Sequence, residues 1–201
     1  AIISVDAVSS LGCVSLPIDQ LGLDIVFTGS QKGWMCPPGL MMISVGPRAF
    51  EACQTAKNPR FYWDLQIARK SFAGGGPPYT PPVSIWYQLD VALAMMRAEG
   101  REQVFARHAA IVTHTHQRLQ QMGLTLFADP NHYSHAVTAV NAPEGVDISA
   151  LLKTLKLEDR VVFQGGQAKL TGKIFRIGHM GYVSIADIDA ALDALQRRLQ
   201  K

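Results

Sequence analysis

Two short apolar runs near the start of the chain restrict its fold more than any other feature. Residues 1–6 read Ala-Ile-Ile-Ser-Val-Asp, residues 24–28 read Asp-Ile-Val-Phe-Thr, and each run stops at small and polar residues. Runs of this length, bounded by turn residues, are typical of buried parallel strands. In an open α/β sheet, ligands bind at the carboxyl ends of such strands. The sequence therefore predicts an α/β fold in which Asp6 and Lys32 lie at the same edge of a sheet.

A carboxylate and a lysine at one sheet edge suit one chemistry in particular. An enzyme that uses pyridoxal 5'-phosphate (PLP) needs a lysine for a Schiff base and an acid opposite the pyridinium nitrogen. A Schiff base requires an amine that is neutral part of the time, and partial burial favours the neutral form of lysine. Two alternatives stay open from these residues alone. In the first alternative, Lys32 is an ordinary surface lysine at a strand end. In the second, Asp6 only caps a turn beside Ser9 and Ser10.

Four motifs, in order along the chain, give it a resemblance to a known family. They are Val5-Asp6-Ala7-Val8-Ser9-Ser10, Gly29-Ser30-Gln31-Lys32-Gly33 with Pro37-Pro38-Gly39, Tyr79-Thr80-Pro81-Pro82-Val83-Ser84, and Arg176-Ile177-Gly178-His179-Met180-Gly181. With these motifs nearly the whole chain resembles the class V aminotransferases, in the alanine–glyoxylate and serine–glyoxylate (serine–pyruvate) branch. The resemblance implies a fold-type-I PLP-dependent transferase. It implies part of the large, mainly parallel-sheet domain followed by a small C-terminal α/β domain.

The resemblance also implies roles for the residues at the first two motifs. Lys32 would be the Schiff-base lysine and would carry the proton between the substrate Cα and the cofactor C4′. Asp6 would hold the pyridine nitrogen protonated, which makes the ring an electron sink. Val8 would pack on the cofactor ring, and Ser30 and Gln31 would contact its phosphate.

The other two motifs imply a second subunit and a substrate contact. In the resembled family Thr80 reaches the phosphate of the neighbouring subunit's cofactor, which implies a homodimer. Relatives in this branch place a tyrosine three residues earlier, where this chain has Pro77, so Tyr79 is a candidate contact only. Arg176 would bind the substrate α-carboxylate, for which a planar guanidinium is well shaped. A structural salt bridge is the alternative for Arg176.

The implied reaction is a ping-pong transfer of an amino group from alanine or serine to glyoxylate or a similar 2-oxo acid. A cysteine desulfurase or a kynureninase is a less favoured member of the same class. A desulfurase needs a reactive cysteine in its C-terminal half, whereas all three cysteines here precede residue 54. Those relatives also carry a histidine just before the lysine, where this chain has Ser30-Gln31.

A different class of function stays open as well. Members of the resembled family are longer, and their front part supplies a phosphate-binding turn and an aromatic residue that stacks on the cofactor. Neither has a counterpart here, so we expect the chain to be a C-terminal portion of an aminotransferase. A catalytically silent fragment or subunit, which needs a partner segment to complete its site, is the alternative.

The resemblance implies two domains: residues 1–100 as the C-terminal part of the large PLP-binding domain, and residues 101–201 as the small C-terminal α/β domain. A glycine- and proline-rich loop at residues 58–82 is expected to serve the contact between subunits. The predicted strands are residues 1–6, 24–28, 40–45, 124–128, 136–140, 161–163 and 173–177. The predicted helices are residues 48–55, a possible segment at 63–69, 83–99, 101–122, 147–155 and 184 onward. The apolar faces of the two long helices comprise Ile85, Leu89, Ala92, Leu93 and Met96, and Val104, Ala109, Ile111, Val112 and Leu119.

Composition narrows the function classes further. The net charge is only +3 and the basic residues are scattered, which does not favour a nucleic-acid surface. Cys13, Cys36 and Cys53 fit no disulfide framework or zinc pattern, so we expect buried or half-buried free thiols in a reducing cytoplasm. No apolar run is long enough to span a membrane.

The histidines show no metal-ligand spacing with cysteine or glutamate. His114 and His116 are two residues apart on a predicted helix and therefore point to different faces. Surface or hydrogen-bonded roles are expected for most of these side chains. His179 follows Arg176 closely and is a weak candidate for the border of a substrate pocket.

Overall fold

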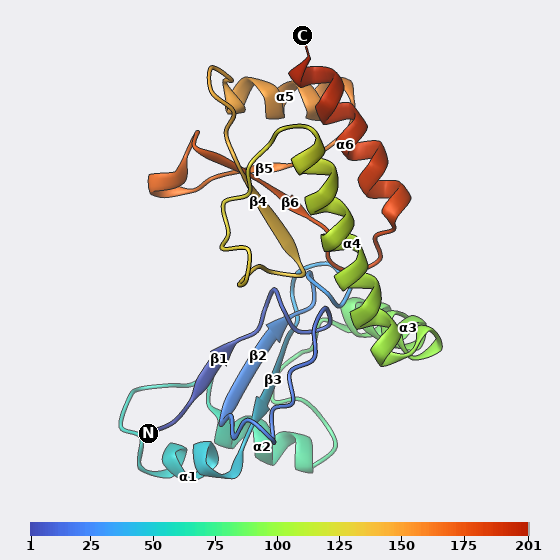
Figure 1. Ribbon diagram of the computed structural model, residues 1–201. Coiled ribbons are helices and arrows are strands. Elements are labelled where there is room, and N and C mark those ends of the chain that lie inside the picture. The colour runs from blue at the N-terminus through green and yellow to red at the C-terminus, as the bar shows by residue number, and fades with distance from the viewer. Residues whose placement is uncertain (201) are drawn as a thin grey trace. The chain divides into compact units, whose positions relative to one another are not determined.

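The computed structural model describes residues 1–200 of the chain (Figure 1). They form two compact units. The first contains residues 1–11 and 15–98, and the second contains residues 12–14 and the chain from residue 99 onward. The domain boundary predicted at residue 100 stays a prediction, and each unit is described by itself below.

The first unit contains a three-stranded sheet in the order β1-β2-β3. Strand β1 (Ser4–Asp6) pairs parallel with β2 (Ile25–Gly29), and β3 (Met41–Val45) pairs antiparallel with β2. A parallel pairing needs a crossover connection of roughly a dozen residues or more, usually a helix. Residues 30–40 contain no helix, so β3 returns in the opposite direction.

The expectation of a buried strand at residues 1–6 is wrong for this structure. Only Ser4–Asp6 forms the strand, and its residues are exposed or half-exposed. The reason is that β1 lies at the edge of the sheet and pairs on one side only. In contrast, β2 is the central strand and buries Val26 and Thr28.

Three helices complete the first unit: α1 (Pro47–Thr55), α2 (Leu65–Ala73) and α3 (Val83–Glu99), whose last residue already belongs to the second unit. The possible segment at residues 63–69 is the start of α2, whose first turn is capped by the Asp64 carboxylate. The predicted apolar face of α3 is confirmed, because its five positions are buried or half-buried while their neighbours along the helix are mostly exposed.

The second unit packs helices α4 (Arg101–Gln121), α5 (Ile148–Glu158) and α6 (Ile185–Leu199) with an antiparallel sheet (Figure 1). The sheet order is β4-β6-β5, with β4 (Val137–Asn141), β5 (Gln164–Gly165) and β6 (Ile174–Gly178), and a short 3-10 helix spans Ala168–Leu170. A single apolar core joins these elements. Its buried members are Ile111, Leu119, Leu124, Val140, Ile148, Leu151, Leu155, Phe163, Phe175, Ile177, Ile188, Leu192, Ala194 and Leu195.

Two predicted strands of this unit are wrong. Residues 124–128 form only an isolated bridge, Leu126 to Val140. Residues 161–163 form no strand. Phe163 packs into the core and stacks on Phe175 with ring centroids 6.1 Å apart, Val161 packs against the core, and Val162 is exposed.

The helix ends of this unit follow local sequence signals. A capping box formed by Ser184 and Asp187 begins α6. Gly123, at φ 77°, ends α4: its N–H donates to Gln120 O, and the N–H of Leu124 donates to Leu119 O. All three cysteines are free, with Cys13 and Cys36 buried and Cys53 half-buried, as expected. No helix within residues 1–200 is both long and apolar enough to cross a membrane.

Candidate active site

The first group of predicted site residues lies where β1 and β2 end. The two strands run parallel with Asp6 opposite Phe27, so Asp6 and the loop that carries Lys32 lie at the same edge of the sheet. Asp6 Oδ1 accepts a hydrogen bond from the Val8 N–H at 2.9 Å, which orients the carboxylate in the turn. Asp6 is exposed and Val8 is half-buried. The turn-capping alternative and a ligand role are therefore compatible, because one carboxylate oxygen remains for another donor.

Hydrogen bonds of Ser30, its first residue, stabilise the loop at residues 30–40. The buried Ser30 donates from Oγ to Pro37 O at 2.6 Å and accepts from the Leu40 N–H at 3.3 Å. Its own N–H donates to Leu40 O, and its carbonyl accepts from the Cys36 N–H, both at 3.0 Å. A hydroxyl has a single proton. Ser30 therefore supports the loop in this structure, and its predicted phosphate contact has no proton left to give.

Lys32 is half-buried on this braced loop. The turn that follows it includes Met35 in the left-handed region at φ 62°, with the Met35 N–H donating to Lys32 O at 3.0 Å. A second tie runs from Trp34 Nε1 to the buried Thr28 Oγ1 at 3.1 Å. Sequence analysis missed this tie, for which a tryptophan two residues after the lysine was the available signal. Together these bonds fix the backbone from which the Lys32 amine projects.

Gln31 is exposed next to Lys32 and folds back over Gly29. A Cβ at Gly29 would lie 2.6 Å from Gln31 Oε1, so the glycine leaves the space that the amide occupies. The predicted phosphate contact of Gln31 stays a prediction. An exposed amide at a strand end retains donors for an anion.

The loop at residues 58–82 holds Tyr79 through its own aromatic residues. Tyr79 donates from its hydroxyl to Phe61 O at 3.1 Å, and its ring stacks on Tyr62 with centroids 4.7 Å apart. The only proton of the Tyr79 hydroxyl is therefore used within the loop. Thr80 is exposed, and Pro77 is half-buried. Of the two candidates in this motif, Thr80 is the one whose hydroxyl is open to a ligand.

Arg176 belongs to the second unit, where it lies on the central strand β6 between Ala139 of β4 and Gln164 of β5. It is half-buried, and its Nε donates to Gly165 O at 3.1 Å. Among residues 1–200 no carboxylate lies within ion-pair distance of its guanidinium, so the structural salt bridge is not found there. The terminal nitrogens of Arg176 keep their donors for a carboxylate ligand.

Histidines beside this sheet form a buried hydrogen-bonded chain. Thr138 Oγ1 lies 2.8 Å from His179 Nε2 and 3.1 Å from His116 Nε2. Burial lowers the pKa of His179 to about 4, with a smaller contribution from His116. His114 instead pairs with Asp189 at 2.7 Å, so the prediction that His114 and His116 use different faces is confirmed. His179 is neutral at pH 7 and serves the interior.

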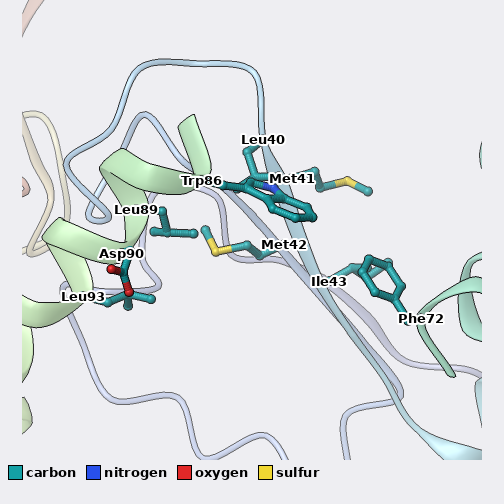
Figure 2. A pocket seen from close by; sticks show the side chains of 9 residues that line it. All are labelled: Leu40, Met41, Met42, Ile43, Phe72, Trp86, Leu89, Asp90 and Leu93. Carbon is teal, nitrogen blue, oxygen red and sulfur yellow. The ribbon is translucent and has the colours of Figure 1, made fainter. Parts of the chain in front are cut away.

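The described residues offer no metal site, and the cavity of the first unit lies away from the predicted site residues. Within residues 1–200 no group of three or more histidine, cysteine or acidic side chains could hold a metal ion. A cavity of about 560 Å³ opens between β3 and α3 of the first unit (Figure 2). Its lining is Leu40, Met41, Met42, Ile43, Phe72, Trp86, Leu89, Asp90 and Leu93. This wall is apolar apart from one carboxylate, so it does not suit a phosphate, and no predicted site residue lines it.

The comparisons with known proteins agree on a family. Residues 1–190 match the family described as Aminotransferase class-V. The protein named "Soluble hydrogenase, small subunit" from Synechococcus sp. (strain PCC 6716) is 48% identical over 196 residues, which is 98% of this chain and 51% of that protein. The L-aspartate–glyoxylate aminotransferase of Paracoccus denitrificans (strain Pd 1222) is 40% identical over 187 residues, 92% of this chain and 47% of that protein.

A solved structure gives the same result for the fold. The alanine–glyoxylate aminotransferase from Nostoc sp. superposes with a TM-score of 0.94 at 30% identity, over 99% of this chain and 54% of that one. The chain thus spans about half the length of the proteins it matches. The predicted fold, that of a fold-type-I PLP-dependent transferase, is confirmed, and PLP is the cofactor that the family implies. This chain belongs to the class V aminotransferase family.

Proposed function

We propose that the protein is a PLP-dependent aminotransferase that moves the amino group of alanine or serine to glyoxylate or a similar 2-oxo acid. The observation that carries the proposal is the parallel pairing of β1 with β2, which brings Asp6 and the Lys32 loop to one sheet edge. The names of the Paracoccus and Nostoc relatives, which both include glyoxylate, support the acceptor.

The donor set at this edge fits the cofactor. One oxygen of Asp6 is held by the Val8 N–H, which leaves the other to accept a hydrogen bond from the N–H of a pyridinium ring. Val8 is half-buried beside it and offers an apolar surface to a ring, while the exposed amide of Gln31 offers donors to a phosphate. When bound, PLP supplies an electron sink that stabilises negative charge at the substrate Cα.

Lys32 has two tasks in this proposal. Its amine would hold the cofactor through the cofactor's aldehyde group, and when free it would carry a proton between the substrate Cα and the cofactor C4′. Both tasks need a fixed geometry, since small displacements reduce rates steeply. The ties from Ser30 to Pro37 and from Trp34 to Thr28 supply that rigidity around Lys32.

The substrate carboxylate and the second subunit complete the proposal. Arg176 would bind the α-carboxylate of the amino acid and of the oxo acid with its terminal nitrogens. Thr80, exposed on its loop, would donate to the phosphate in the neighbouring subunit of a homodimer. Sedimentation of the purified protein should show a dimer, and a stable, fully active monomer would contradict this part.

The test of the proposed function is the Lys32→Ala variant with Lys57→Ala as its control. Lys57 is an exposed lysine of the same unit. We expect Lys32→Ala to lose the visible absorbance of bound cofactor and to reduce kcat/KM by at least ~10⁴-fold. Lys57→Ala should leave both unchanged. A purified wild-type protein that never takes up PLP would overturn the proposal in favour of a catalytically silent fragment or subunit.

The amino donor needs its own measurement. Alanine, serine and aspartate should be tested against glyoxylate and pyruvate, because Arg176 selects only for a carboxylate. The proposal expects alanine or serine to give the highest kcat/KM with glyoxylate. A clear preference for aspartate would contradict alanine or serine as the amino donor and would instead match the donor in the name of the Paracoccus relative.

A further inference from the structure

The second unit contains a polar cluster, centred on Gly181, that the proposed function does not use. Gly181 lies in the loop between β6 and α6, and both of its backbone groups are bonded to side chains of α4. Its carbonyl accepts from Arg107 Nη1 at 2.8 Å, and its N–H donates to His108 Nε2 at 3.1 Å. At φ 83° this position is in the left-handed region, which favours glycine. The two hydrogen bonds therefore fix the loop at Gly181, the residue whose left-handed conformation also turns the chain.

Arg107 is itself held in place before it reaches the loop. Its Nε lies 2.6 Å from Glu99 Oε1 and its Nη2 lies 3.0 Å from Glu99 Oε2, a bidentate pair that leaves Nη1 for Gly181. The same Nη1 reaches Val183 O at 3.4 Å. Hydrogen bonding to Arg107 holds the pKa of Glu99 below its ordinary value. The pair is thus charged at neutral pH and orients the guanidinium.

His108 is fully buried, and its neighbours determine which nitrogen carries the proton. Nδ1 lies 2.7 Å from Val104 O. A carbonyl only accepts, so Nδ1 is the donor, and Nε2 keeps a lone pair for the Gly181 N–H. Burial is the main cause that lowers the pKa of His108, which keeps this neutral form at pH 7.

Cys13 brings another segment of the chain to the same cluster. Residues 12–14 belong to the second unit, and the Cys13 side chain is fully buried there. Burial raises the pKa of its thiol, while the Gly181 backbone and the Arg107 charge oppose that change in part. The thiol thus lies close to the Gly181 backbone and within the electrostatic influence of Arg107.

The cluster is relevant to substrate binding because the loop it holds follows β6, the strand that carries Arg176. Arg176 and Gly178 are two residues apart on β6 and therefore share one face of the sheet. The loop leaves the strand at Gly178, two residues after Arg176. The His179 N–H first donates to Ala136 O at 3.0 Å, and the cluster then holds the loop at Gly181.

We infer that Glu99, Arg107 and His108 are positioning residues for the substrate carboxylate, because they fix the loop that begins directly after the strand of Arg176. This inference rests on the proposed function, which gives Arg176 its role. The cluster would set the affinity for the carboxylate and leave proton transfer by Lys32 unaffected. Its loss should therefore raise KM and leave kcat nearly unchanged.

The experiment compares Arg107→Ala with Arg118→Ala in the purified protein. Both arginines lie on α4 with similar side-chain exposure, 25% and 22%, and both pair with carboxylates, but Arg118 pairs with Asp189 and Asp193 of α6. Glycolate serves as an unreactive two-carbon carboxylate. We expect Arg107→Ala to raise the glycolate Kd and the glyoxylate KM about tenfold, with kcat within about twofold. Hydrogen exchange at residues 178–184 should quicken, and Arg118→Ala should change none of these.

A second pair of variants tests the acceptor on His108. His108→Gln retains an oxygen that can accept from the Gly181 N–H, whereas His108→Leu removes the acceptor and keeps the bulk. His108→Leu should reproduce the Arg107→Ala result, and His108→Gln should restore the exchange rate at residues 178–184. If Arg107→Ala does not fold, Arg107→Lys keeps the charge, loses the bidentate pair and answers the same question.

The outcomes separate the two proposals. A wild-type protein that neither takes up PLP nor transaminates overturns the proposed function. An active wild-type protein in which Arg107→Ala and Arg118→Ala bind glycolate equally well overturns the positioning role alone. A fall in kcat at unchanged KM also overturns it.

Discussion

The two units of the chain differ in how they use their apolar side chains. The second unit gathers many of them in one core, in which Phe175, Leu192 and Leu195 are fully inaccessible, although Leu157 and Tyr182 are exposed. The first unit leaves large ones at its surface: Phe61 is 72% exposed and Trp63 is 67% exposed. Contiguous exposed apolar groups are typical of surfaces that bind other proteins, and in the first unit the rings of Tyr62 and Trp63 are in edge contact with centroids 5.0 Å apart. The proposed cofactor residues lie in the unit with little core of its own, and Arg176 lies in the unit that has one.

The largest effect should come from removing a core side chain of the second unit. Phe175 is fully buried on the central strand and stacks on Phe163. Phe175→Ala should lower the free energy of unfolding by about 3–5 kcal/mol, because it removes buried apolar surface and leaves a cavity. Denaturant unfolding of the two proteins measures the difference. A loss of less than about 1 kcal/mol in the free energy of unfolding would mean that this core is loosely packed. The contrast between the two units would then fail.

Acid should act on the second unit through His179. Its pKa of about 4 in the folded state is below the ordinary value of 6.5, so the unfolded state binds the proton more readily. The stability is therefore complete above about pH 6.5, falls as the pH drops, and is lowest below about pH 4. The full change is about 3 kcal/mol for this residue. Burial lowers the pKa values of His108 and His116 too, which adds to the loss in the same direction.

The control for this pH dependence is His179→Gln, which can still hydrogen-bond to Thr138 but does not titrate. The free energy of unfolding, measured at several pH values between 7 and 4, should fall less steeply in the variant than in the wild type. Parallel curves would show that His179 does not bury its neutral form as the structure indicates.

Local signals explain what the sequence predicted well. The apolar faces of α3 and α4 repeat every three to four residues, so their positions along the chain are enough to place them. On α4 the five predicted positions are buried or half-buried. The capping box at Ser184 is likewise contained within four residues. Such features need no knowledge of the tertiary fold.

The features that were missed depend on distant residues. Arg107 and Gly181 are 74 positions apart, and nothing near either residue in the sequence indicates their bond. The brace from Ser30 to Pro37 shows the same limit at shorter range, since a serine beside a lysine predicts an anion contact equally well. The expected strand at residues 161–163 failed because apolar content alone does not distinguish a core-packed loop from a strand.

A smaller effect is expected at the start of α6. The Ser184 hydroxyl accepts from the Asp187 N–H at 3.2 Å, and Asp187 Oδ2 accepts from the Ser184 N–H at 2.9 Å. Ser184→Ala removes one half of this box and should cost about 1 kcal/mol. Thermal or denaturant unfolding will detect the change. Because the buried face of α6 contributes more to the stability of the second unit than the cap does, the unit should stay folded without the cap. Loss of the fold in this variant would contradict that ranking.

The smallest effect should come from Trp63 of the first unit. At 67% exposure its ring is in water in this structure, so Trp63→Ala should change the free energy of unfolding of the chain by less than about 0.5 kcal/mol. The same substitution should weaken self-association if this surface binds a second copy in the proposed dimer. Sedimentation at several protein concentrations separates the two quantities. A stability loss above about 2 kcal/mol in a protein that remains monomeric would show that Trp63 is buried within one chain, and the contrast between the two units would then fail.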